Sequence, residues 1–183
     1  MDSKKIVCLG DSITWGFPYG PGCSWVNIAS VVLGVSMINR GINGETAGDL
    51  LDRFEKNVIS EIPAEVFVMA GTNDAAIGIS PDVFINNVTA MITMSRDNRI
   101  IPILGLPVPS LDRLLENQME KYRCRLRQLS KVTGIQTVDF SSVMIDTDGI
   151  VKLKNYMDDV HPSKEGYKAM AACFVEFYRK ANE

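Results

Sequence analysis

The sequence is poor in the residues that bind metals or form disulfides. It has one histidine and four cysteines in 183 residues. The cysteines are Cys8, Cys23, Cys124 and Cys173, which form no C-x-x-C pair and no metal-ligand spacing. Two of them, Cys8 and Cys173, lie in apolar periodic segments, where a free thiol behaves as a small hydrophobic side chain. We therefore expect a reducing compartment and no metal site built on cysteine.

Long apolar runs and an excess of positive charge are also missing. No stretch approaches the roughly 20 apolar residues that a membrane-spanning helix needs, and the N-terminal apolar run is too short for a signal peptide. A net charge of −3 leaves no basic surface for nucleic acid in the totals. The densest basic run, residues 121–131, has the spacing of a solvated helix face. We expect a cytoplasmic protein that acts on a small molecule, without a nucleic-acid partner or a membrane span, and the residues favour no particular oligomeric state.

What the sequence does contain is the composition of one compact domain. Hydrophobic residues make up 46% of the chain and charged residues 22%, which is ordinary for a globular protein. A chain of 183 residues can bury roughly 70% of the surface that its unfolded form exposes. Because no repeat, low-complexity tract or linker divides the chain, residues 1–183 are predicted to form a single domain.

Short apolar runs alternate with longer segments of helical spacing along the whole chain. The predicted strands are residues 5–10, 35–40, 65–70, 100–105 and 135–140, and the predicted helices are residues 24–33, 46–58, 81–95, 112–132 and 163–181. This alternation predicts an α/β fold with a parallel sheet covered by helices on both faces. Ligands bind at the carboxyl ends of the strands in such sheets, so a site is expected in the loops that follow the strands.

Ser12 comes two residues after the first predicted strand, in the segment GDSITWG. This position is right for an exposed nucleophile at the edge of the sheet. The surroundings are not the G-x-S-x-G turn of α/β-hydrolases, so the geometry of that family does not apply. A serine in such a turn is more often a cap or a turn former.

The single histidine, His161, lies near the C-terminus in the segment YMDDVHPSKEGY. A serine hydroxyl is a poor nucleophile at neutral pH and needs a base within hydrogen-bonding reach. Asp158 precedes the histidine by three residues, a spacing that lets a carboxylate hold the tautomer and orientation of the imidazole. The ordinary alternative is a surface or capping histidine.

Two loops after strands offer donors for an oxyanion, which acyl transfer also requires. Gly44, in RGINGETAGDLL, can present a backbone N–H without a side chain in the way, and Asn73, in AGTNDAAIG, carries a side-chain amide. Taken alone, each residue is better explained as part of a turn.

Four segments together resemble the signature blocks of the SGNH hydrolases, the GDSL-like esterases, lipases and acylhydrolases. These segments are GDSITWG at 10–16, INGETA at 42–47, GTND at 71–74 and DDVHP at 158–162, in the order of the family. The resemblance spans residues 5 to about 170 and is specific because four ordered blocks follow successive predicted elements. It implies that Ser12 is the nucleophile, His161 the general base and Asp158 its orienting partner. It also implies that the oxyanion hole is formed by the backbone N–H groups of Ser12 and Gly44 and by the side-chain amide of Asn73.

The resemblance further implies a flavodoxin-like three-layer α/β/α sandwich with a five-stranded parallel sheet, and an enzyme that needs no metal or organic cofactor. Asp11 and Asp74 match positions that support the loops. The chain has GDSI rather than GDSL, a conservative change. It also has Asp159 where the family often has glycine, which puts the local backbone in question because aspartate tolerates left-handed conformations less well.

Two other functions are open from the residues. The first is a metal-dependent phosphoesterase, which uses side chains like the carboxylates, the amide and the histidine near the strand ends. Two-metal enzymes of that kind, however, usually recruit several histidines. A non-catalytic α/β binding module that keeps the motif as loop scaffolding is the second alternative. Covalent labelling of Ser12 discriminates the module from an enzyme.

The substrate is expected to be a carboxylic ester, with a thioester or an O-acetyl group as variants. Residues 17–25, 105–112 and 147–157 are predicted to wall the acyl and leaving-group pockets, and their aromatic residues Phe17, Tyr19, Trp25 and Tyr156 suit acyl chains or sugar rings. Short acyl esters, lysophospholipids, acyl thioesters and acetylated sugars are all compatible with these residues.

Overall fold

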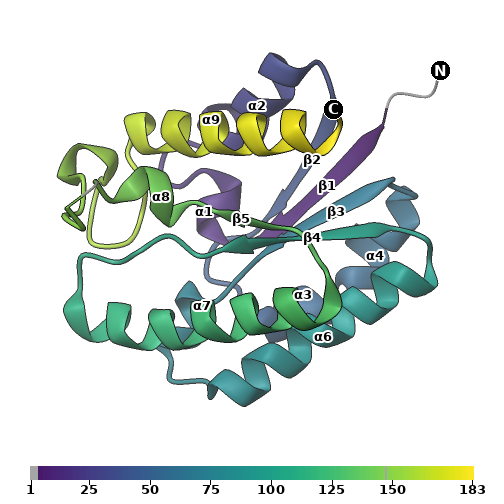
Figure 1. Cartoon of the computed structure of the whole chain (residues 1–183), viewed down its shortest axis with the longest axis horizontal. Helices are drawn as coiled ribbons and strands as arrows, with labels where there is room; N and C mark the ends of the chain where they lie inside the picture. The colour runs from purple at the N-terminus through teal and green to yellow at the C-terminus, as the bar shows by residue number, and fades with distance from the viewer. Residues whose placement is uncertain (1–3, 147) are drawn as a thin grey trace.

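A five-stranded parallel sheet forms the centre of the computed structural model, which describes residues 4–146 and 148–183. Its strands are β1 (Lys5–Gly10), β2 (Ser36–Gly41), β3 (Glu65–Met69), β4 (Ile101–Leu106) and β5 (Thr137–Asp139). The strand order is β2-β1-β3-β4-β5, and all four neighbouring pairs are parallel (Figure 1). This is the flavodoxin-like order. The expected five-stranded parallel sheet is confirmed.

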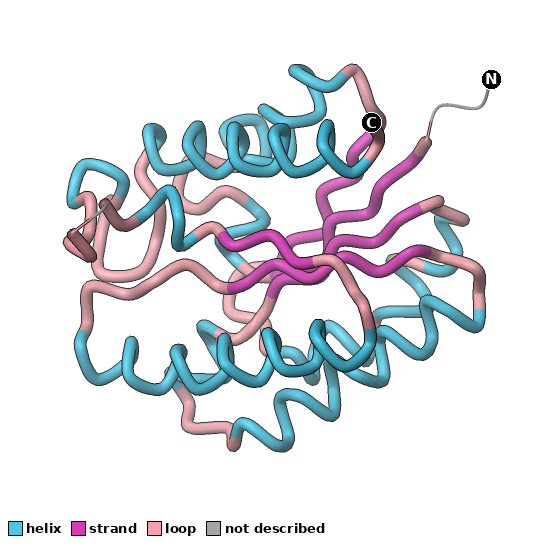
Figure 2. The backbone as a smooth tube through the Cα atoms, viewed as in Figure 1, coloured by secondary structure: helices cyan, strands magenta, loops and turns pink. Residues whose placement is uncertain are grey.

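Helices cover both faces of the sheet, so the three-layer α/β/α arrangement is also confirmed (Figure 2). One layer contains α2 (Trp25–Leu33), α8 (Ser141–Met144) and α9 (Lys164–Ala181), and the other contains α3 (Ala47–Asp52), α4 (Phe54–Asn57), α6 (Pro81–Asp97) and α7 (Arg113–Thr133). Two short helices, α1 (Ser12–Trp15) and α5 (Thr72–Ala76), follow β1 and β3 directly. Within residues 4–146 and 148–183, no helix combines the length and apolar character that crossing a bilayer requires.

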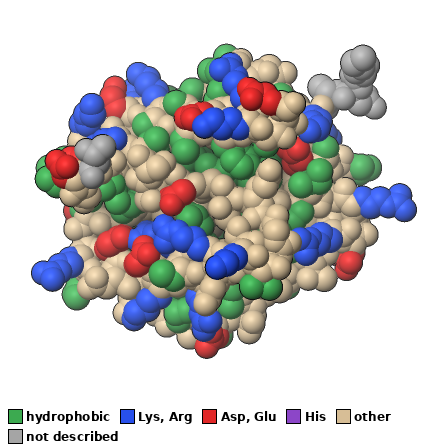
Figure 3. All heavy atoms as spheres, in the orientation of Figure 1, with side chains coloured by type: hydrophobic (Ala, Val, Ile, Leu, Met, Phe, Trp, Pro, Cys, Tyr) green, Lys and Arg blue, Asp and Glu red, His purple; other side chains and the backbone are tan. Residues whose placement is uncertain are grey.

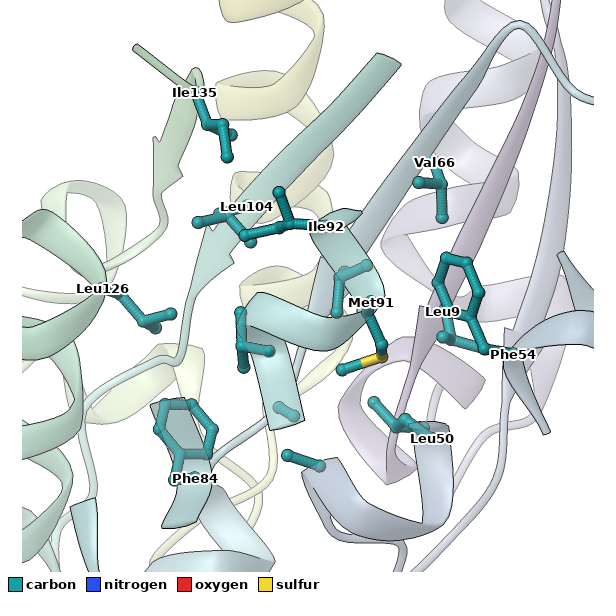
Figure 4. Packing of buried hydrophobic residues seen from close by; sticks show 14 of the residues in the cluster. Leu9, Leu50, Phe54, Val66, Phe84, Met91, Ile92, Leu104, Leu126 and Ile135 are labelled. Carbon is teal, nitrogen blue, oxygen red and sulfur yellow. The ribbon is translucent and has the colours of Figure 1, made fainter. Parts of the chain in front are cut away.

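Alternating side chains of each strand divide the core between the two faces of the sheet. From β1, Val7 and Leu9 join the cluster beneath α3, α6 and α7, whereas Ile6 and Cys8 join the cluster beneath α2 and α9. Figure 4 shows the first cluster, with Leu9 among side chains from the covering helices. Full burial of each such side chain stabilises the fold by about 1.5–3 kcal/mol. The core therefore fixes the strands, and with them the loops at their carboxyl ends.

Two predicted elements differ from the structure. The helix predicted at 46–58 is broken at Arg53, which leaves helical geometry with φ −105° and ψ 8° between α3 and α4. The side chain of Arg53 reaches backbone carbonyls on two strands, and this long-range contact competes with continuation of the helix. The strand predicted at 135–140 is shortened to β5, because Phe140 already has helical backbone angles as the cap of α8.

The basic run at 121–131 lies on α7, and its interpretation as a solvated face is wrong at one position. The side chain of Arg123 is only 2% exposed. It pairs with Glu116 and Glu120 of the same helix and donates to the carbonyl of Pro107 at 3.3 Å. On the face drawn in Figure 3, basic and acidic side chains are interspersed.

Candidate active site

Ser12 begins helix α1 at the carboxyl end of β1. Asp11 caps this helix, and its Oδ1 atom accepts a hydrogen bond from the N–H of Ile13 at 2.9 Å. The turn is tightly packed, since a Cβ atom at Gly41 would lie 2.2 Å from the backbone nitrogen of Trp15. Ser12 is 7% exposed. The hydroxyl of Ser12 therefore lies at the carboxyl end of the sheet, in a tightly packed turn that restricts its orientation.

A continuous hydrogen-bonded chain joins Ser12, His161 and Asp158. The Oγ atom of Ser12 lies 3.0 Å from Nε2 of His161, and Nδ1 of His161 lies 2.8 Å from Oδ2 of Asp158. The phenyl ring of Phe17 packs against the imidazole with a centroid distance of 4.6 Å. These contacts orient the imidazole between a hydroxyl and a carboxylate, as acid–base chemistry on the hydroxyl requires.

The loop before α9 holds Asp158 by its own backbone. Oδ1 of Asp158 accepts hydrogen bonds from the N–H groups of Val160 at 2.8 Å and His161 at 2.6 Å. Partial burial works to raise the pKa of Asp158, but the hydrogen bonds from His161 and Val160 outweigh it and hold the pKa below its ordinary value. Asp158 is therefore ionised at neutral pH.

Asp159, where the local backbone was in question, has no left-handed conformation. Among the non-glycine residues that the structure describes, positive φ angles occur at Ile62 and Arg99. The carbonyl of Asp159 accepts hydrogen bonds from the N–H of Leu111 at 2.7 Å and from the hydroxyl of Ser110 at 2.9 Å. The loop after β4 thus anchors the loop of Asp158 and His161.

Gly44 and Asn73 follow β2 and β3 at the carboxyl edge of the sheet, Gly44 in a loop and Asn73 in helix α5. Gly44 is exposed, has φ +83° and has open space around the position of a Cβ atom. Asn73 lies in α5 and donates one amide hydrogen to the carbonyl of Glu45 at 2.8 Å, which leaves its second amide hydrogen available. Within the described ranges, neither residue is hydrogen-bonded to Ser12, and the N–H groups of Ser12 and Gly44 donate to no protein acceptor.

Asp11 and Asp74 are both buried, and both bind backbone N–H groups. The two carboxylate oxygens of Asp74 each lie 3.1 Å from the N–H of Ala47, at the start of α3. Burial raises the pKa of Asp11 to about 6 and that of Asp74 to about 6. These contacts tie the loop after β2 to α5 and close the turn before Ser12.

The aromatic residues expected to wall the pockets divide into two groups. Phe17 contacts the imidazole, as described, and Tyr19 packs edge-on against Tyr167. The expectation is wrong for Trp25, which is 0% exposed in the core. It is also wrong for Tyr156, whose buried hydroxyl donates to the carbonyl of Pro109 at 2.6 Å. Residue 147 of the third predicted wall lies outside the described residues.

Sequence reasoning missed one pair beside the site, Arg53 and Glu45. The guanidinium of Arg53 lies 2.6 Å from Oε2 of Glu45, and both side chains are mostly buried. The available signal was a charged residue within an amphipathic segment, which is too common to single out.

The cluster expected for a metal-dependent enzyme does not assemble in the part of the chain that the structure describes. No group of three or more histidine, cysteine, aspartate or glutamate side chains in these ranges is arranged to hold a metal ion. Asp11 and Asp74 instead turn their oxygens to backbone donors.

Comparison with known proteins gives a family and several relatives. A family model described as the GDSL-like Lipase/Acylhydrolase family matches residues 8–169. The chain is 31% identical to a lipolytic protein of the G-D-S-L family from Desulfitobacterium hafniense DCB-2, with a TM-score of 0.89 over 94% of this chain and 98% of that structure. It is 25% identical to the acetylxylan esterase of Geobacillus stearothermophilus, over 94% of this chain and 92% of that protein.

A third relative is the uncharacterized lipoprotein YqeF of Bacillus subtilis (strain 168). It is 34% identical over 122 residues, which cover 60% of this chain. The match covers 50% of the lipoprotein, so the chain spans about half the length of this curated relative.

Proposed function

The chain belongs to the GDSL-like lipase/acylhydrolase family, and from this membership we propose that it is a serine hydrolase of carboxylic esters that acts through Ser12. In this proposal His161 is the general base and Asp158 orients the imidazole. The hydrogen-bonded chain of 3.0 Å from Ser12 to His161 and 2.8 Å from His161 to Asp158 is the single observation that supports these roles most strongly.

Acylation begins at the hydroxyl of Ser12. Nε2 of His161 takes the hydroxyl proton as Oγ attacks the carbonyl carbon of the ester, which gives a tetrahedral oxyanion. Nδ1–H of the imidazole donates to Asp158, whose lowered pKa keeps it ionised, so its charge stabilises the imidazolium that forms.

The oxyanion is stabilised by the backbone N–H groups of Ser12 and Gly44 and by the amide of Asn73. Their positions at three strand ends, with donors left free of protein acceptors, support this role. Removal of one such donor typically lowers kcat by about 10²–10³. Collapse of the tetrahedral species transfers the proton from His161 to the leaving alcohol, and water activated by the same imidazole then hydrolyses the acyl-enzyme.

Fluorophosphonate labelling tests the nucleophile directly. The probe is added to the wild-type protein, to Ser12→Ala and to His161→Ala, and folding of each variant is checked by circular dichroism. We expect labelling of the wild type alone. Labelling of folded Ser12→Ala, or no labelling of active wild type, contradicts the assignment, and an inert wild-type protein favours the non-catalytic binding module.

The substrate is proposed to be an ester with a short acyl group, such as an O-acetyl group on a carbohydrate. The imidazole and carboxylate are accessible from solvent, since the side chains of His161 and Asp158 are 22% and 42% exposed, and the acetylxylan esterase relative supports hydrolysis of an acetyl ester. A groove of about 590 Å³ lies between α5 and the first turns of α7, lined by Ala75, Ala76 and Asn117 among others. Because α5 also carries Asn73, we assign this groove to the part of the substrate beyond the ester. A chain-length series of nitrophenyl esters, with thioesters and acetylated sugars, discriminates the substrate classes.

A cytoplasmic location is proposed as well. All four cysteines are free, which supports a reducing compartment. The lipoprotein relative makes membrane attachment the alternative. Cell fractionation with antibody detection discriminates the two, since a lipoprotein sediments with membranes.

A further inference from the structure

Arg53 joins the carboxyl ends of two strands to the loop that contains Gly44. Its Nη2 atom donates to the carbonyl of Gly10, at the end of β1, at 3.2 Å and to the carbonyl of Arg40, in β2, at 2.9 Å. Its Nε and Nη2 atoms each lie 2.6 Å from Oε2 of Glu45. One guanidinium, on a side chain that is 13% exposed, thus binds the backbone carbonyls of two strands and the side chain of Glu45.

Two of these points, Gly10 and Glu45, are close in the chain to a proposed oxyanion donor. Gly10 precedes Ser12 by two residues in the tight turn after β1. Glu45 directly follows Gly44, and its carbonyl accepts the hydrogen bond of the Asn73 amide at 2.8 Å. Arg53 therefore contacts the turn of one donor directly and reaches the other two through Glu45.

Gly44 itself has no side chain that could anchor it, although hydrogen bonds from Asn73 to Glu45 and from Ala47 to Asp74 tie its loop to α5. Gly44 has no side chain, is exposed and has a positive φ of +83°, so the direction of its N–H depends on its neighbours. Glu45 is the neighbour whose side chain is bound, and the ion pair is largely shielded from water. A shielded, charge-assisted contact with a planar guanidinium has a narrow range of geometries.

We propose that Arg53 is a positioning residue for the oxyanion hole. It fixes the N–H of Gly44 and the amide of Asn73 in their positions relative to Ser12. This inference rests on the proposed function, because it concerns the oxyanion donors of the same active site. A lysine at position 53 keeps the charge but loses the planar fork, and its Nζ atom ends one bond short of the Nη2 atom that contacts Glu45 and both carbonyls. Since misplacement by about 1 Å can lower rates by about 10², we expect Arg53→Lys to lower kcat by about 10- to 100-fold. KM should change by less than about threefold, because the oxyanion contact strengthens only in the transition state.

The test is steady-state kinetics on a nitrophenyl acetate substrate with Arg53→Lys, Asn73→Ala and the double variant, and with Ser12→Ala as the inactive reference. If Arg53 acts through the oxyanion donors, the double variant loses much less than the product of the two single losses. Glu45→Gln provides a second probe of the pair with a smaller change in volume, in case the lysine variant does not fold. Arg127→Lys, at a remote ion pair with Glu120 and Asp139, is the matched control and should keep its wild-type kcat.

The outcomes separate this inference from the proposed function. Two results together support the positioning role. In Arg53→Lys or Glu45→Gln, kcat falls while KM stays nearly constant. When Arg53→Lys is combined with Asn73→Ala, the loss in kcat is smaller than the product of the two single losses. Wild-type kcat in a folded Arg53 variant, or losses that multiply in full, overturns it while the proposed function stands. Full activity of Ser12→Ala overturns the proposed function and this inference together.

Discussion

The hydroxyl of Ser12 and Nε2 of His161 lie 3.0 Å apart although 149 positions separate the two residues in the chain. Ser12 follows β1, the second strand from one edge of the sheet, and His161 precedes the C-terminal helix α9. Tyr167 of α9 reinforces this closure, because its hydroxyl donates to the carbonyl of Phe17 at 2.8 Å. The first and last loops of the fold therefore meet through buried packing rather than through a local turn.

Replacement of Asp158 by asparagine should abolish most activity. The new amide oxygen can still accept the N–H groups that Oδ1 accepts now, but the amide nitrogen would then face Nδ1 of His161 as a donor and favour the wrong tautomer. We expect Asp158→Asn to lower kcat by about 10²–10⁴ with little change in KM. The matched control is Asp159→Asn, since its exposed side chain forms no hydrogen bond to the residues that the structure describes, whereas its backbone carbonyl is bound. Equal losses in both variants would contradict the assignment of Asp158.

Stability should depend on pH through Asp11. Burial raises its folded-state pKa to about 6, above an unfolded value of about 3.9. The folded state therefore binds more protons between these values, and stability falls as pH rises from about 4 to about 6. Asp11→Asn keeps a capping oxygen and does not titrate, so it should weaken this decline in urea unfolding at pH 4.5 and 7. The exposed Asp52→Asn is the control, and an unchanged slope in Asp11→Asn would refute the role of Asp11.

Carboxylates with a lowered pKa affect the free energy of unfolding in a different pH range. The contribution of Asp158 to stability is present above its unfolded pKa of about 3.9 and is lost as pH falls through its lower folded value. Acid unfolding below about pH 4 therefore reports Asp158 together with other carboxylates of lowered pKa, such as Asp49 and Glu120, whereas the decline above pH 4 reports the buried carboxyls of Asp11 and Asp74.

Trp25 should prove to be a core residue rather than part of the substrate pocket. It contacts Phe67, Phe140 and Phe174, with ring centroids 4.9, 5.2 and 5.3 Å away. Trp25→Ala should lower the free energy of unfolding by about 3–5 kcal/mol, measured by urea denaturation. A stable variant with an altered KM would instead place Trp25 at the substrate.

A tryptophan at position 76 should obstruct the groove between α5 and α7. Ala76 is exposed and lines this groove, so Ala76→Trp should raise KM by about tenfold for esters with a bulky leaving group and leave nitrophenyl acetate unaffected, equivalent to about 1.4 kcal/mol of binding. Gln128→Trp, at an exposed position on α7 outside the groove, is the control. If the two substrates respond alike, the groove does not hold the substrate.

Much of this fold could be predicted from local pattern. The strand at 5–10 has clear limits because an apolar run lies between Lys5 and Gly10, and β1 has the same bounds. Helices α1 and α5 contain 4 and 5 residues, too few to display a helical period. The break at Arg53 was not predictable because it depends on carbonyls that only the assembled sheet presents.

The candidate site was predictable in residue type and not in geometry. Ser12 and His161 could be selected because the chain has one histidine and one serine in the GDS segment. Their contact depends on how α9 packs on the sheet, which no local pattern encodes. An aromatic residue such as Trp25 has the same local pattern in a pocket wall and in a core, so its burial required the structure.

Trapping the acyl-enzyme tests the central claim most directly. The wild type and Ser12→Ala are mixed with nitrophenyl acetate, quenched in acid within milliseconds to seconds and analysed by peptide mass spectrometry, while release of nitrophenol is followed in parallel. We expect one acetyl group on the peptide that contains Ser12 in the wild type, and neither acetylation nor catalysed release in the variant. Acetylation at another residue of the wild type, or hydrolysis by Ser12→Ala at the wild-type rate, would contradict Ser12 as the nucleophile.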